Sequence, residues 1–164
     1  MSDVGTLSRT DAAWRALADV PDPELPALSV VDLGIVRGVA ELDDGTLEVT
    51  LTPTYSGCPA TEVIEASVLA ALATIGPARA RTQLAPAWTT DWISDEGQRK
   101  LREYGIAPPG RCADASPVRI VRRIACPRCG SMHTERLSAF GATACKSLYR
   151  CLDCREPFEH FKPI

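Results

Sequence analysis

The sequence predicts an α+β protein, in which a small mixed sheet with flanking helices is followed by a four-cysteine metal-binding module. Three observations lead to this prediction. Strand-like and helix-like patterns alternate over the first 105 residues. A segment rich in proline and glycine then interrupts these patterns. Two closely spaced cysteine pairs follow in the C-terminal part of the chain.

The first expected elements are a helix and a hairpin. Residues 8–20 have apolar side chains at helical spacing behind an N-cap at Ser8 or Thr10. Residues 30–42 and 45–53 are rich in Val, Leu and Ile, and an Asp-Asp-Gly turn signal lies between them. We therefore expect a short helix followed by an antiparallel hairpin.

A longer helix, a third strand and a further helix come next. Apolar residues recur every three or four positions within residues 59–75, which is typical of an amphipathic helix. Residues 78–84 predict a short strand at a sheet edge. Residues 94–105 predict a helix that is capped by Ser94 and ended by Gly105.

The composition divides the chain into two domains. Residues 1–105 are expected to form the α/β domain, residues 106–118 the linker, and residues 119–164 the metal-binding domain. Residues 119–164 contain nine Lys and Arg and four acidic residues, which gives them a net charge of +5. Because the whole chain has a net charge of −3, residues 1–118 have a net charge of −8. Opposite charges of this kind favour two modules with different surfaces.

The cysteine pairs are the strongest chemical motif. Cys126 and Cys129 form one C-x2-C pair, and Cys151 and Cys154 form a second. Zn²⁺ binds four thiolates as a tetrahedron, and this spacing is close to that of zinc ribbons. We expect a structural zinc that compensates for a small hydrophobic core, although iron also suits four thiolates.

A separate thiol, Cys58, stands before the helix expected at residues 59–75. With Pro59 as the first helical residue, Cys58 lies at or beside the N-cap, where the helix dipole favours an anion. A reactive or metal-passing thiol is one interpretation, and a small apolar cap is the other. Both histidines, His133 and His160, lie in the metal-binding domain, so a thiol enzyme with a Cys–His pair is poorly supported.

The acidic residues Asp22 and Glu24 lie in a loop whose conformation is restricted by prolines. This loop could fold over the Cys58 turn and supply additional oxygen ligands for iron, or it could form an edge at which a partner docks. The alternative is an ordinary solvated loop that caps a neighbouring element.

Two stretches resemble known families. The segments DPELPALSVVDLGIV and LTPTYSGCPATEVI resemble the small α/β domain of SufT-like iron–sulfur assembly proteins. The C-terminal segment CPRCGSMHTERLSAFGATACKSLYRCLDCREPFEHFKPI, appended to that domain, resembles the PaaD family, the D proteins of phenylacetyl-CoA oxygenase (epoxidase) systems. The positions that match the SufT-like motif are Asp22, Pro23, Glu24, Asp32, Leu33, Gly34, Thr52, Gly57, Cys58 and Pro59.

The resemblance implies an accessory protein and no enzyme. Its role would be to mature or maintain the iron–sulfur or di-iron centres of the oxygenase in aerobic phenylacetate degradation, with iron or an iron–sulfur cluster held transiently at Cys58. Its partners would be the oxygenase and reductase subunits, the iron–sulfur assembly machinery, and a second copy of the chain in a homodimer. The alternative is a non-catalytic zinc-ribbon scaffold that docks oxygenase subunits.

Several classes of function are disfavoured by composition. No apolar run approaches the roughly 20 residues that span a bilayer, and the first residues do not resemble a signal peptide. We therefore expect a cytoplasmic protein with reduced thiols. Nucleic-acid binding is not expected either, because the basic domain has only four aromatic residues and two of them are needed for its core.

Overall fold

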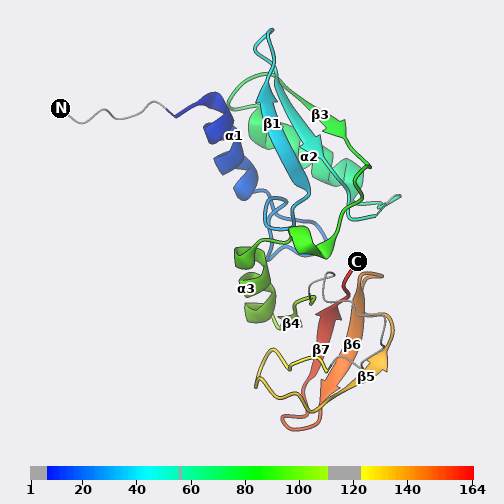
Figure 1. The fold of residues 1–164 in the computed structure, drawn as a ribbon. Helices are drawn as coiled ribbons and strands as arrows, with labels where there is room; N and C mark the ends of the chain where they lie inside the picture. Colours follow the sequence, from blue (N-terminus) through cyan, green and yellow to red (C-terminus); the bar gives the residue numbers. More distant parts are fainter. Residues whose placement is uncertain (1–6, 56, 111–122) are drawn as a thin grey trace, which may run out of the picture. The chain divides into compact units, whose positions relative to one another are not determined.

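A computed structural model describes residues 7–55, 57–110 and 123–164 (Figure 1). The chain divides into two compact units, Met1–Trp88 and Thr89–Ile164. Each unit contains one sheet and its own helices, so the predicted α+β class is confirmed. No helix of the described residues is long and apolar enough to cross a membrane.

The sheet of the first unit has three strands in the order β1–β2–β3. Strands β1 (Val36–Glu41) and β2 (Leu47–Leu51) form the antiparallel hairpin, in which Gly45 takes a φ of +78°. Strand β3 (Ala78–Thr82) lies parallel to β2 at the sheet edge. The sheet is therefore mixed, as predicted, because a helical crossover separates β2 from β3.

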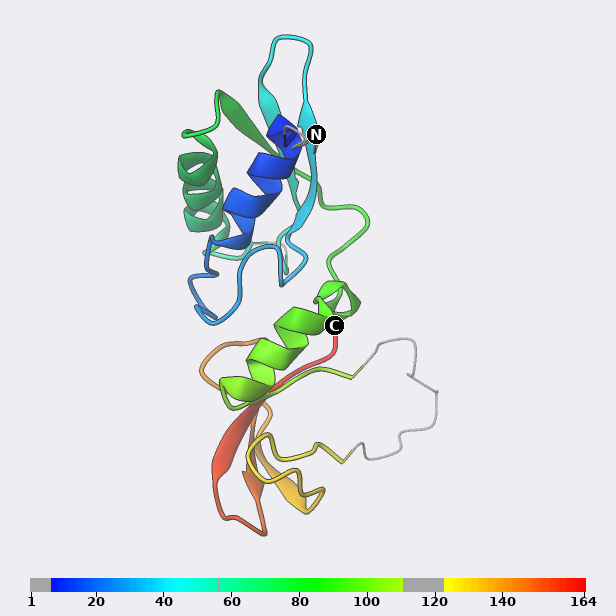
Figure 2. The same cartoon turned by 90° about the vertical axis from the view of Figure 1, so that its left-hand side faces the viewer.

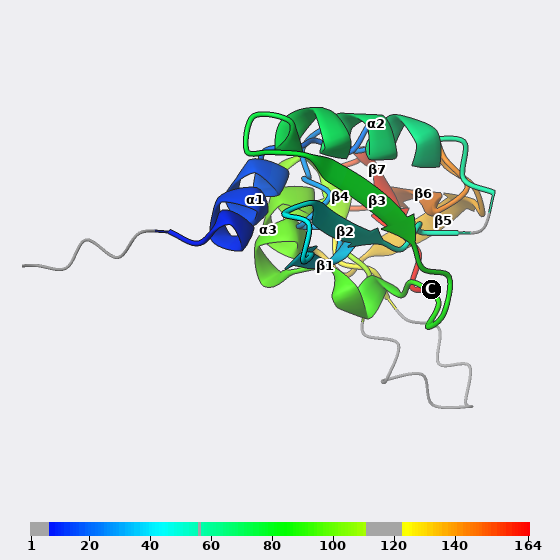
Figure 3. The same cartoon turned by 90° about the horizontal axis from the view of Figure 1, so that it is seen from above.

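Two helices pack on one face of this sheet (Figure 2). Helix α1 (Arg9–Ala18) contacts β1 and begins with a capping box between Ser8 and Asp11. Helix α2 (Thr61–Leu72) contacts β3, as the view from above shows (Figure 3). Buried side chains of this unit come from both helices and from alternate positions of β2. The loop between α1 and β1 adds further ones, among them Leu28, Val30 and Leu33.

The start of α2 differs from the prediction. The first helical residue is Thr61 and the N-cap is Ala60, which makes no side-chain capping hydrogen bond. The backbone N–H of Thr61 donates to the Cys58 carbonyl over 3.1 Å, so residues 58–61 form a turn before the helix begins. Cys58 therefore lies two residues before the N-cap and not at it.

The second unit begins with a 3₁₀ turn, η1 (Thr90–Trp92), and helix α3 (Asp95–Glu103). The Ser94 side chain caps α3 by accepting from the Gly97 N–H at 2.9 Å, as predicted. Four strands follow in the spatial order β4–β7–β6–β5. They are β4 (Ile106–Ala107), β5 (Thr134–Ser138), β6 (Lys146–Cys151) and β7 (Pro157–Phe161).

The observed boundary between the units lies earlier than the expected one at residue 105. Ile106 and Ala107, the first residues of the expected linker, form β4 and pair in parallel with Glu159 and His160 of β7. This backbone pairing joins α3 to the second sheet, so the first unit ends at Trp88. The rest of the expected linker, including Cys112, lies largely outside the described residues.

Candidate functional site

Each cysteine pair lies in a tight turn that aims two sulfurs in one direction. In the first turn, the Gly130 N–H donates to the Cys126 carbonyl over 2.9 Å, and Gly130 takes a φ of +74°. In the second, the Cys151 N–H donates to the Glu156 carbonyl over 3.0 Å. Arg155 has a φ of +66° there, a left-handed conformation that is uncommon for a residue with a side chain.

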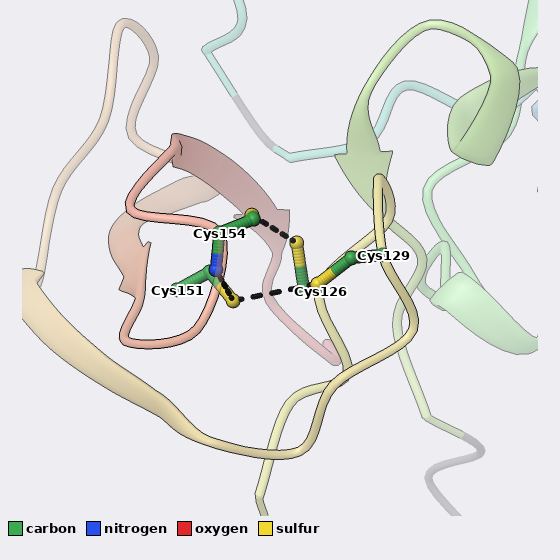
Figure 4. A group of neighbouring side chains, drawn as sticks. All are labelled: Cys126, Cys129, Cys151 and Cys154. Atoms are coloured by element: carbon green, nitrogen blue, oxygen red, sulfur yellow. Dashed lines mark hydrogen bonds between the residues drawn. The ribbon is translucent and has the colours of Figure 1, made fainter.

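The four sulfurs converge between the two turns (Figure 4). All four lie within 4.8 Å of one another. The Sγ atoms of Cys126 and Cys154 are 3.8 Å apart, and those of Cys129 and Cys151 are 3.6 Å apart. Zn–S bonds of about 2.3 Å give a tetrahedron with edges of about 3.8 Å. The four thiols therefore have the spacing that a tetrahedral thiolate site requires.

Backbone N–H groups favour the ionised form of one ligand in particular. The Cys154 N–H points at the Cys151 sulfur over 3.5 Å. This contact is the main reason that the pKa of Cys151 is lowered to about 7. A metal ligand must be a thiolate, so the turn prepares Cys151 to bind a metal near neutral pH.

Beside the four sulfurs, side-chain hydrogen bonds connect the two cysteine turns. Ser131 donates to the Asp153 carboxylate, and the His133 Nδ1 lies 3.4 Å from the other oxygen of Asp153. The Ser131 hydrogen bond is the main cause of a lowered pKa for Asp153. The side chain of His133 is 71% exposed, and His133 is not a member of the four-ligand group.

The four-cysteine site is also part of a small core. Cys126 and Cys151 are buried together with Ala107 and Phe158, and Ile124 and Tyr149 pack against them. Cys129, in contrast, is exposed. Cys126 and Cys151 thus take the place of apolar side chains in this core, whereas Cys129 brings the site to the surface.

The turn before α2 holds the single thiol of the first unit. The Cys58 N–H donates to the Tyr55 carbonyl over 3.3 Å, and Gly57 takes a φ of +84°. Cys58 is 9% exposed, so its side chain lies just beneath the surface while Gly57 is exposed.

Asp22 and Glu24 have different environments. The Asp22 Oδ1 accepts from the backbone N–H groups of Glu24 at 2.9 Å and Leu25 at 2.8 Å. Asp22 is buried, and this burial is the main cause of its raised pKa. These contacts match the loop-capping interpretation, whereas Glu24 is exposed. Among the residues that the structure describes, Cys58, Asp22 and Glu24 are not gathered into a three-ligand group.

One residue of the second unit had no signal in the sequence. His160 is 5% exposed on β7, and its burial lowers its pKa to about 4. Its neighbours in the sequence, Glu-His-Phe, do not indicate that the imidazole points inward. Only the register of β7 against β6 places it there.

Family models match most of the chain. A model described as iron–sulfur cluster assembly protein matches residues 10–82, and one described as PaaD zinc beta ribbon domain matches residues 114–162. The first match lies within the first unit and the second match within the second unit.

Individual proteins agree with these matches. An Escherichia coli (strain K12) protein, the D component of a "Putative 1,2-phenylacetyl-CoA epoxidase", is 48% identical over 153 residues, which is 92% of this chain and 91% of that protein. The Fe-S protein maturation auxiliary factor YitW of Bacillus subtilis (strain 168) is 37% identical over 84 residues, covering 51% of this chain and 80% of that protein.

A solved structure supports the fold of the first unit. The domain of unknown function DUF59 from Bacillus anthracis is similar with a TM-score of 0.53 and 26% identity, over 57% of this chain and 91% of that domain. Together with the full-length similarity to the Escherichia coli protein and the match to the zinc ribbon model, this shows that the chain belongs to the PaaD family, that of the D components of phenylacetyl-CoA epoxidase.

Proposed function

We propose that this protein is an accessory factor that matures or maintains the metal centres of a multicomponent phenylacetyl-CoA epoxidase. It is not the component that carries out the oxygenation. The observation that supports this function most directly is the placement of Cys58. The only thiol of a unit that matches an iron–sulfur assembly family lies in a tight glycine turn, close to the surface.

With a single thiol, the first unit cannot by itself supply all the ligands of an iron–sulfur cluster. Iron–sulfur clusters in proteins are usually held by about four thiolates, and the first unit supplies one. Iron or a cluster at Cys58 is therefore a transient substrate, whose remaining ligands come from a partner or from a second copy of this chain. Asp22 is committed to its loop through two hydrogen bonds, so Glu24 is the better placed of the two acids to add an oxygen ligand.

The four-cysteine site has a structural role in this proposal. Cys126, Cys129, Cys151 and Cys154 hold one zinc ion, which supplies a tetrahedral crosslink between the two turns and does no redox chemistry. The 3.6 and 3.8 Å sulfur separations support a tetrahedral ion. Iron fits four thiolates as well. Metal analysis of the purified protein, in parallel with its absorption spectrum, distinguishes the two.

The partners follow from the proposed role. The factor meets the epoxidase and reductase components that contain the metal centres, and the iron–sulfur assembly machinery that supplies them. We assign docking to the second unit, because the net charge of its ribbon residues 119–164 is positive while that of the first unit is negative.

A matched pair of cysteine variants tests the function in cells. Cys58→Ala removes the proposed carrier thiol, and Cys145→Ala removes a half-buried thiol outside the four-cysteine site. Both proteins should fold, since truncating a cysteine removes a single sulfur atom. We expect the epoxidase complex from Cys58→Ala cells to contain less iron per complex, and that from Cys145→Ala cells to match wild type.

A reconstitution assay separates this function from docking. Epoxidase and reductase that already contain their metal centres should turn over without this chain. If turnover requires stoichiometric amounts of the chain, it is a working part of the enzyme. If, in addition, the epoxidase from Cys58→Ala cells contains all of its metal centres, the chain acts as a zinc-ribbon scaffold that docks the epoxidase subunits.

A further inference from the structure

A cavity lies within the second unit, to which all of its described lining residues belong. Ser147 and Tyr149 of β6 and His160 of β7 line it from the sheet. Ser147 pairs directly with His160 across the two strands, so their side chains share one face. Residues 108–110, after β4, and residues 123–125, before the first cysteine turn, also line it.

His160 presents an unsatisfied polar atom in this setting. The His160 Nδ1 lies 3.4 Å from the Ser147 Oγ, whereas its Nε2 is buried and has no hydrogen-bond partner among the described residues. An unpaired buried polar group costs about 1–3 kcal/mol, so such atoms are rare in native proteins. The Ser147 hydroxyl also lies 3.4 Å from the His160 backbone carbonyl, so Nδ1 can accept from Ser147 or donate to it. An anionic ligand would select the tautomer that has its proton on Nε2, because only that tautomer makes Nε2 a donor.

Positive side chains surround the same cavity. Arg102, Arg123 and Arg136 line it, and no carboxylate in the described part of the chain forms an ion pair with any of them. Glu135 also lines the cavity, but it is paired with Arg150. The cavity therefore has unbalanced positive charge at its edge.

Apolar surface completes the lining. The Tyr149 ring stacks on Phe158 with centroids 5.8 Å apart, and its edge-to-face contact with His160 measures 5.7 Å. Ile124 and the prolines that follow β4 add aliphatic surface. A complementary ligand thus has an anionic group, a hydrogen-bond acceptor and an apolar body.

We propose that this cavity binds a small organic anion, a carboxylate or a phosphate ester with an aromatic or aliphatic body. The anionic group interacts with Arg102, Arg123 and Arg136, an oxygen atom accepts from His160 Nε2, and the body packs against Tyr149. The site belongs to the second unit, whereas Cys58 belongs to the first.

Nuclear magnetic resonance of the zinc-loaded, full-length protein tests the proposal. Phenyl phosphate, benzoate and inorganic phosphate serve as probes, and the imidazole nitrogens of His160 report binding. We expect saturable shifts of His160 Nε2 with phenyl phosphate or benzoate, and a much weaker response to inorganic phosphate. The stronger of the two organic probes identifies the preferred anionic group. A response to inorganic phosphate equal to that of both organic probes would contradict a site for an organic anion.

Variants make the test specific. Arg102→Gln should weaken binding by about tenfold, the loss of one charge-assisted hydrogen bond. The control is Arg99→Gln on the same helix, which removes the same charge from a side chain that pairs with Glu96 and Glu103 outside the cavity. His160→Phe should abolish binding while the thermal transition shows a folded protein. Equal affinities for the Arg102 and Arg99 variants, or no shift of His160 with any probe, would overturn the proposal.

Discussion

The burial of His160 should make the second unit sensitive to acid. The folded protein holds this imidazole at a pKa of about 4 because burial disfavours its charged form, against 6.5 for the unfolded chain. Below pH 6.5 the unfolded state binds a proton that the folded state does not, so stability falls as the pH decreases toward 4. The full difference corresponds to about 3 kcal/mol, and about 2 kcal/mol of it is lost between pH 7 and pH 5.

Comparison with His160→Phe measures this loss. Phe cannot bind a proton and can retain the aromatic contact with Tyr149. The free energy of unfolding of both proteins should be measured by denaturant titration at pH 7 and pH 5, with the same concentration of zinc. We expect wild type to lose about 2 kcal/mol more than the variant over this interval.

The four cysteines and the Lys146–Glu159 ion pair are present in both proteins, so their own pH dependence cancels in the difference. Equal losses in the two proteins would refute the reasoning, since they would mean that the His160 pKa is the same in the folded and unfolded states.

Two further predictions concern the ribbon. Cys151→Ser should release zinc and unfold the second unit while the amide signals of β1, β2 and β3 persist, because the metal replaces much of a small core. A Cys145→Ser protein should retain one zinc per chain, and an equal loss of zinc in both proteins would contradict the ligand assignment. Gly141→Ala should reduce stability by about 1–3 kcal/mol, since its Cβ would lie 2.5 Å from the Glu159 Oε1. The Ala142 N–H donates to this oxygen, and Lys146 holds the same carboxylate through Oε2. Gly38→Ala places its Cβ in open space and should change stability by less than about 0.5 kcal/mol, so similar thermal shifts for the two would argue against this close contact.

Local features were predictable from the sequence because they depend on neighbours in the chain. Ser94 and Gly105 delimit α3 as expected, since a cap contacts backbone groups within three or four residues. The cysteine pairs likewise form two tight turns, and their spacing alone indicated a four-thiolate site. The apolar spacing in residues 59–75 predicted which face of α2 is buried, including Ile64, Val68 and Leu72.

The strand predictions were weaker where a strand is exposed or very short. Strand β5, with the sequence Thr-Glu-Arg-Leu-Ser, has only half-buried or exposed side chains, so no apolar alternation indicated it. Strand β4 has two residues and exists through its pairing with β7, about 50 positions later in the chain. A partner so distant in the sequence leaves no local pattern.

The tertiary structure alone decided the environment of the candidate functional groups. The sequence identified Cys58 but placed it at the helix start, whereas the turn before Thr61 moves it outside the helix. The sequence also identified Asp22, but only the folded loop shows that its Oδ1 accepts from two backbone N–H groups. Residue types and spacings thus determine which chemistry the chain can supply. Burial, hydrogen-bond partners and charge around each group depend on strands and loops remote in sequence, and only the packed structure brings these together.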